Sequence, residues 1–245
     1  MGSGIAHVVS LSGRRVQLLD LDQNLLRRSI ETIEKNMARQ ASRGKVTEED
    51  VKSALSRIET GTDYSGFKNC DIVIEAATEN EDIKRKIFQE MAGCLNEHTL
   101  LATNTSSISI TRLASTTDRP EKFIGMHFFN PVPLMKLVEI IDGVATEKAV
   151  GDKLMELGVL MTRHPVRCTD APGFLVNQVG RGYNIEAAHI NSEKVASIPD
   201  LDRILSEGAG FRMGPFTLLD LTGLDVTHPA TELIYRQFYE EPRYR

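Results

Sequence analysis

Cysteine, excess positive charge and long apolar runs are all scarce in this sequence. The three cysteines, Cys70, Cys94 and Cys168, form no closely spaced pair, which is typical of a protein in a reducing, cytoplasmic setting. The net charge of −5 and the sequence pI of about 5.7 indicate no basic face for nucleic acid. No apolar run approaches the roughly 20 residues that cross a bilayer, and no signal peptide is visible. We therefore expect neither nucleic acid nor a membrane as a partner.

The composition is otherwise that of a globular protein, with 245 residues, 41% hydrophobic and 26% charged. This length allows one large domain or two modest ones. Strand and helix patterns alternate over the first 140 or so residues, which predicts a parallel sheet covered on both faces. Strands are expected at 15–22, 70–77, 99–107, 122–129, 134–141 and 164–170, and helices at 23–43, from Thr47, at 80–95 and at 146–161.

The pattern changes near residues 168–172 and is mostly helical from there onward. We therefore predict two domains, 1–170 and 171–245, the second of them all-α. Pro172 suits the first turn of a helix, which would place Asn177 one turn further along. Within the first domain, the helical stretches between residues 23 and 57 predict a protruding hairpin.

The first residues, "MGSGIA", are small and are typical of a helix that packs closely on a sheet. Gly2 is a candidate for the last glycine of a dinucleotide-binding G-x-G-x-x-G turn. Asp20 ends the strand "VQLLD", 18 residues after Gly2, where an acid binds the ribose of a dinucleotide. A carboxylate there repels a 2′-phosphate, which favours NAD over NADP. A plain turn acid at a strand end is the other interpretation.

The stretch "GMHFFNPVPLMKLVEI" (125–140) contains the candidate for chemistry. Its strand–turn–strand pattern predicts that His127 and Glu139 lie side by side. A carboxylate beside an imidazole orients the ring and favours its charged form, which makes a proton acceptor for an alcohol. Ser106 lies in the polar loop of "TNTSS", where the carboxyl end of such a sheet binds ligand. A His–Glu pair by itself is more often structural than catalytic.

Six motifs together resemble the L-3-hydroxyacyl-CoA dehydrogenase family, in particular its bacterial 3-hydroxybutyryl-CoA and 3-hydroxyadipyl-CoA branches. They run in the family's order over almost the whole chain: "MGSGIA", "VIEAATEN", "TNTSSISI", "HFFNPVPLMKLVEI", "PGFLVNQV" and "GAGFRMGPFTLLDLTGLD". The resemblance implies a Rossmann-like doubly wound sheet, NAD as cofactor and an acyl-CoA substrate. It also implies a homodimer through the all-α domain, and it requires no metal.

The resemblance assigns roles by position. His127 matches the catalytic base, Glu139 its partner, Ser106 a contact of substrate and cofactor, and Asn177 a residue that holds the reacting carbonyl. It implies cofactor contacts at Gly2, Asp20, Glu79, Lys84, Ser106 and Asn130, and coenzyme A contacts at Ser106, Asn36, Arg43 and Lys45. Arg43 and Lys45 are equally typical of a solvated turn.

The sequence also departs from the family pattern at its two ends. The family's first strand and first two fingerprint glycines should precede Met1, and a basic turn should follow Arg245. We therefore expect a chain that is clipped at both ends, is marginally stable and has a low affinity for NAD. The alternatives are a nucleotide-binding or structural homologue without turnover, a fragment of the enzyme, and a dehydrogenase of free hydroxy acids.

Overall fold

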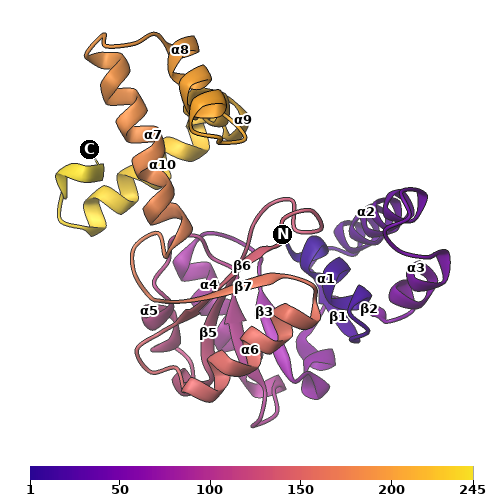
Figure 1. The fold of residues 1–245 in the computed structure, drawn as a ribbon. Coiled ribbons are helices and arrows are strands. Elements are labelled where there is room, and N and C mark those ends of the chain that lie inside the picture. Colours follow the sequence, from indigo (N-terminus) through magenta and orange to yellow (C-terminus); the bar gives the residue numbers. More distant parts are fainter. Residues whose placement is uncertain (245) are drawn as a thin grey trace. The chain divides into compact units, whose positions relative to one another are not determined.

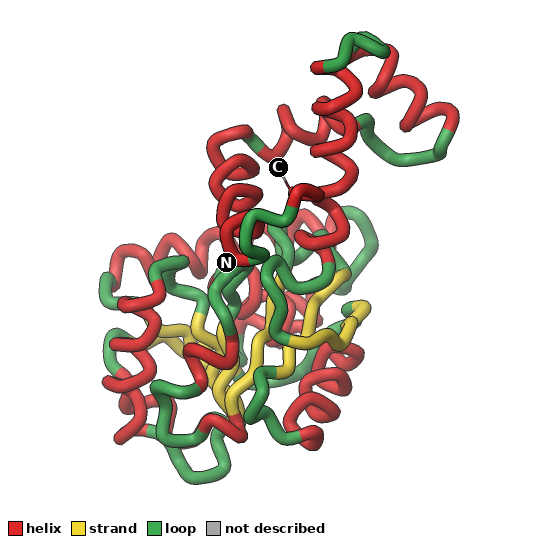
Figure 2. The backbone as a smooth tube through the Cα atoms, turned by 90° about the vertical axis from the view of Figure 1, so that its left-hand side faces the viewer, coloured by secondary structure: helices red, strands yellow, loops and turns green. Residues whose placement is uncertain are grey.

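The structure is a computed structural model that describes residues 1–244. The chain divides into two compact units, Met1–Asp170 and Ala171–Arg245. The strands of the described residues all belong to the first unit (Figures 1 and 2). No helix of the described part is long and apolar enough to cross a bilayer.

The strands of the first unit form two sheets. One contains β1 and β2, which run parallel, and the other has the order β3-β4-β5-β6-β7. All neighbours in the larger sheet are parallel except β5 and β6, which pair antiparallel. The strands are β1 (Val16–Leu19), β2 (Ile58–Gly61), β3 (Ile72–Glu75), β4 (Leu100–Thr103), β5 (Phe123–Phe128), β6 (Leu137–Asp142) and β7 (His164–Thr169).

The larger sheet is thus mainly parallel, as predicted, and the predicted strand–turn–strand of residues 125–140 forms its one antiparallel pair. The connection between β5 and β6 is only residues 129–136, and a parallel connection needs a crossover of a dozen or more residues. The sequence pattern did not predict the short strand β2. Its sequence IETG contains one large apolar residue, so it becomes a strand only through its pairing with β1.

Four helices of the first unit, α2 to α5, begin at a residue whose side chain caps the helix. Asp22 accepts a hydrogen bond from Asn24 N at the start of α2, and Thr47 and Asp50 form a reciprocal capping box at the start of α3. The longer helices pack beside the sheets (Figure 1). They are α1 (Gly2–Leu11), α2 (Gln23–Ser42), α3 (Glu48–Leu55), α4 (Glu81–Met91), α5 (Ile110–Ala114) and α6 (Lys148–Leu160), with short 3₁₀ turns at Tyr64–Asn69, Ala92–Cys94 and Pro120–Lys122.

The main core joins the larger sheet to α1 and α6. Every residue of β5 is buried, and Ile124, Met126 and Phe128 pack with Val8 of α1 and Leu154 of α6. Burying each such side chain stabilises the fold by about 1.5–3 kcal/mol. The core therefore holds the carboxyl end of β5 rigidly.

The second unit consists of helices joined by turns and loops, with no strand among its described residues. Its core is small and centres on Ile185, Ile234 and Tyr244. Its elements are α7 (Val176–Ser192), α8 (Ile198–Arg203), the π turn Ile204–Gly208, α9 (Pro215–Thr222), α10 (Leu224–Gln237) and the 3₁₀ turn Pro242–Tyr244.

The predicted start of this unit's first helix is wrong by several residues. Pro172 lies in a turn, and α7 begins at Val176, so Asn177 is its second residue. Gly173 has φ +73°, and a Cβ there would lie 2.7 Å from Ile234 Cδ1. Because this backbone is left-handed, the helix cannot extend back to Pro172.

Candidate active site

The carboxyl ends of three adjacent parallel strands meet at one edge of the larger sheet. The β3–α4 loop contributes Glu79, the β4–α5 loop contributes Ser106, and β5 contributes His127 next to its last residue. Crevices outside the carboxyl ends of strands are where sheets of this kind bind ligands. The structure thus brings these three predicted residues to one edge.

His127 and Glu139 form the predicted pair. They are directly opposite each other in the β5–β6 register, and His127 Nδ1 lies 2.6 Å from Glu139 Oε2. Glu139 is fully buried and His127 is 6% exposed. With Nδ1–H donating to the carboxylate, Nε2 is the nitrogen with the lone pair. The pair therefore sets the tautomer that a proton acceptor requires.

Asn104 supports the strand end that carries His127, a role that the sequence pattern did not predict. Its Oδ1 accepts a hydrogen bond from Phe128 N at 2.9 Å, and its own N–H donates to Glu75 O at 2.7 Å. Asn104 therefore ties the end of β4 to β5 through its side chain and to β3 through its backbone N–H. An asparagine directly after a strand was the available signal.

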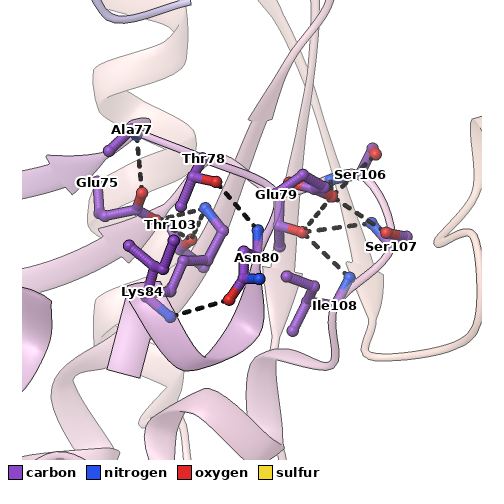
Figure 3. Close-up of polar contacts among 12 residues, drawn as sticks. Glu75, Ala77, Thr78, Glu79, Asn80, Lys84, Thr103, Ser106, Ser107 and Ile108 are labelled. Atoms are coloured by element: carbon purple, nitrogen blue, oxygen red, sulfur yellow. Dashed lines mark hydrogen bonds and ion pairs between the residues drawn. The ribbon is translucent and has the colours of Figure 1, made fainter. Parts of the chain in front are cut away.

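Glu79 binds the loop that carries Ser106. Its Oε1 accepts hydrogen bonds from Thr105 Oγ1 at 2.6 Å, Ser106 N at 2.8 Å, Ser106 Oγ at 3.0 Å and Ser107 Oγ at 3.1 Å (Figure 3). The carboxylate therefore connects the β3–α4 loop to the β4–α5 loop. The prediction that Glu79 contacts the cofactor stays a prediction.

Lys84 belongs to a buried ion pair under the same edge. Its Nζ lies 2.5 Å from Glu75 Oε2 and 3.3 Å from Thr103 Oγ1, and its side chain is fully buried (Figure 3). Thr103 Oγ1 also donates to Glu75 Oε2, and Glu75 Oε1 accepts from Ala77 N. The network joins β3, β4 and α4. Lys84 was predicted to contact the cofactor, but in the structure its ammonium pairs with Glu75 inside the fold.

The N-terminus of α1 and the end of β1 carry the predicted dinucleotide residues. Close packing in the segment of small residues occurs at Gly4, where a Cβ would lie 2.9 Å from Val132 Cβ, whereas a Cβ on Gly2 would meet nothing within 4 Å. Asp20 directly follows β1 and is half-buried, and its Oδ1 accepts from Asp22 N at 3.3 Å. Helix N-termini attract phosphate groups. The N-terminus of α1 and Asp20 at the end of β1 therefore both fit a bound dinucleotide.

A cavity of about 160 Å³ lies between α1, α2 and the turn 130–133. Asn36 and Asn130 both line it, which brings one predicted coenzyme A contact beside one predicted cofactor contact. Arg43 and Lys45 are exposed beyond the end of α2. His7 also lines the cavity, and burial lowers the pKa of its imidazole.

Asn177 lies in the second unit, and its prediction as a substrate contact stays a prediction. His189 is an exposed residue of α7. Among residues 1–244, no group of three or more His, Cys, Asp or Glu side chains is arranged to hold a metal ion.

The sequence matches two family models in succession. Residues 1–171 match "3-hydroxyacyl-CoA dehydrogenase, NAD binding domain", and residues 173–245 match "3-hydroxyacyl-CoA dehydrogenase, C-terminal domain".

Among curated proteins, a 3-hydroxyadipyl-CoA dehydrogenase of Escherichia coli is 42% identical over 244 residues, all of this chain and 51% of that protein. A 3-hydroxybutyryl-CoA dehydrogenase of Bradyrhizobium diazoefficiens is 44% identical over 96% of this chain and 80% of its own length. This chain thus spans about half of the first relative and most of the second.

Among solved structures, an (S)-3-hydroxybutyryl-CoA dehydrogenase from Ralstonia eutropha aligns with a TM-score of 0.97 at 39% identity. The alignment covers the whole of this chain and 86% of that one.

Proposed function

The chain belongs to the 3-hydroxyacyl-CoA dehydrogenase family, and from that premise we propose that it interconverts an L-3-hydroxyacyl-CoA and a 3-oxoacyl-CoA with NAD. The observation that carries the proposal is the buried His127–Glu139 pair at the carboxyl edge of the sheet. Its tautomer leaves Nε2 to accept a proton from an alcohol.

His127 Nε2 takes the proton of the 3-hydroxyl as the C3–H bond breaks. Glu139 stabilises the imidazolium that forms and holds the ring in place. Ser106 donates a hydrogen bond to the oxygen as it becomes a carbonyl. The bound NAD⁺ would supply the acceptor for the hydride that leaves C3. In the reverse direction, protonated His127 returns the proton to the oxygen.

The residues present fit NAD. The first unit matches the family's NAD-binding domain, the N-terminus of α1 suits a pyrophosphate, and Asp20 at the end of β1 suits a ribose without a 2′-phosphate. Gly2 would lie nearest the pyrophosphate, and Ser106 and Asn130 remain the proposed residues around the rest of the cofactor.

The α2–α3 hairpin favours a coenzyme A thioester over a free hydroxy acid. Arg43 and Lys45 are exposed cations in its connecting loop, where they can bind phosphates, and Asn36 lines the cavity next to α1. We further propose a cytoplasmic homodimer that pairs through the second unit.

The test is oxidation of NADH with acetoacetyl-CoA, compared with free acetoacetate at the same concentration. We expect turnover with the thioester only. Equal turnover with acetoacetate would instead favour a dehydrogenase of free hydroxy acids. Tight NADH binding without turnover of either compound would favour a nucleotide-binding homologue.

A further inference from the structure

One oxygen of Glu79 receives more hydrogen-bond donors than it can hold well. Four donors from residues 105–107 lie within 3.1 Å of Oε1 (Figure 3). A carboxylate has about four lone-pair sites on its two oxygens, or two on each. The two longest of the four bonds come from the hydroxyls of Ser106 and Ser107, so these are the bonds that can be exchanged at low cost.

The Ser106 hydroxyl has a single proton. In the structure it donates that proton to Glu79, whereas the proposed reaction needs it on the oxygen of the substrate. A hydroxyl cannot donate to both acceptors at once. Ser106 must therefore exchange Glu79 for the substrate oxygen during the reaction.

We infer that Glu79 is a positioning residue that acts through Ser106. Its bonds to Ser106 N and Thr105 Oγ1 fix the loop, and they remain when the Ser106 hydroxyl turns away. The loop therefore keeps its place while the hydroxyl changes partner. The inference rests on the proposed function and assigns Glu79 a task separate from cofactor contact.

Glu79→Gln tests this role, because the amide keeps the size of the side chain and removes its charge. Hydrogen bonds to charged groups are the stronger ones, so we expect kcat to fall about tenfold with little change in KM for NADH. The matched control is Glu81→Gln. Glu81 is a neighbouring carboxylate that pairs with Arg85 and Arg112, and we expect kcat to stay unchanged.

The decisive comparison repeats both substitutions in a Ser106→Ala background. If Glu79 acts through Ser106, Glu79→Gln has no further effect on kcat once the hydroxyl is gone. The inference would be overturned if Glu79→Gln lowered kcat by the same factor with and without the Ser106 hydroxyl. It would also be overturned if Glu79→Gln raised only KM for NADH, which would leave Glu79 as a cofactor contact.

Amide hydrogen exchange of residues 104–108 provides a readout that does not need turnover. We expect faster exchange in Glu79→Gln than in the unsubstituted protein or in Glu81→Gln. If the unsubstituted protein fails to reduce acetoacetyl-CoA, the proposed function is wrong, and the exchange result still decides whether Glu79 positions the loop. Unchanged exchange would contradict the inference.

Discussion

At the scale of single residues, the chemistry depends on short polar side chains at strand ends. The sequence pattern predicted that His127 and Glu139 lie side by side, and the register confirms it. The pattern did not reveal that Glu79 binds the Ser106 loop or that Asn104 supports Phe128, since both contacts join segments distant in sequence. Such contacts follow from the order of strands, which periodicity alone does not provide.

The cofactor preference depends on Asp20. Because its carboxylate repels a 2′-phosphate, we expect a high ratio of kcat/KM for NAD over NADP. Asp20→Ala should narrow that ratio, measured with both cofactors at saturating substrate. Asp22→Ala is the control, since Asp22 caps α2 and its loss should leave the ratio unchanged. Equal use of NAD and NADP by the unsubstituted protein would contradict the assignment.

His7 should make stability depend on pH. Burial, and more weakly the charge of Arg163, lower the pKa of its imidazole below the ordinary value near 6.5, against the raising effect of its hydrogen bond with Gln40. The unfolded chain therefore binds more protons than the folded chain in this range, so the free energy of unfolding falls as the pH drops below about 6.5.

His7→Gln should flatten this dependence in urea unfolding measured at several pH values. The control is His98→Gln, because His98 is an exposed histidine. If the free energy of unfolding of His7→Gln depended on pH as strongly as that of the unsubstituted protein, His7 would not be the cause of the pH dependence.

At the scale of elements, most helices and strands were predictable because their periodicity and caps agree with the fold. The Asp22 and Thr47 caps are examples. The errors have tertiary causes: β2 exists through its partner β1, and the turn before α7 follows from the left-handed Gly173. Buried ion pairs such as Lys84–Glu75 were equally invisible, since a lysine on an amphipathic helix is usually exposed.

The Lys84–Glu75 pair should be essential to the junction of β3, β4 and α4. Lys84→Met would leave the Glu75 carboxylate buried without its cation, so we expect a loss of about 3 kcal/mol in the free energy of unfolding. Lys86→Met is the matched control: Lys86 pairs with Glu90 at the surface and should cost less than about 1 kcal/mol. If urea unfolding showed that both substitutions lower the free energy of unfolding by the same amount, a structural role for the buried pair would be contradicted.

At the scale of the whole molecule, the second unit exposes more apolar surface than its small core explains. Val179, Leu221 and Val226 are each more than 60% exposed. Large exposed apolar surfaces are typical of protein interfaces, which supports the proposed homodimer. Light scattering at micromolar concentration should give the mass of two chains, and Val179→Asp should shift it toward one. A single-chain mass for the unsubstituted protein would refute the dimer.

The central claim is that His127, oriented by Glu139, accepts the proton of the substrate alcohol. The most direct measurement is the steady-state rate of NADH oxidation with acetoacetyl-CoA for the unsubstituted protein and for His127→Gln. NADH binding to each protein, followed by fluorescence, serves as the control. We predict that kcat falls by about 10²-fold or more while KM and NADH affinity change little. A His127→Gln protein with the unsubstituted kcat would contradict the account.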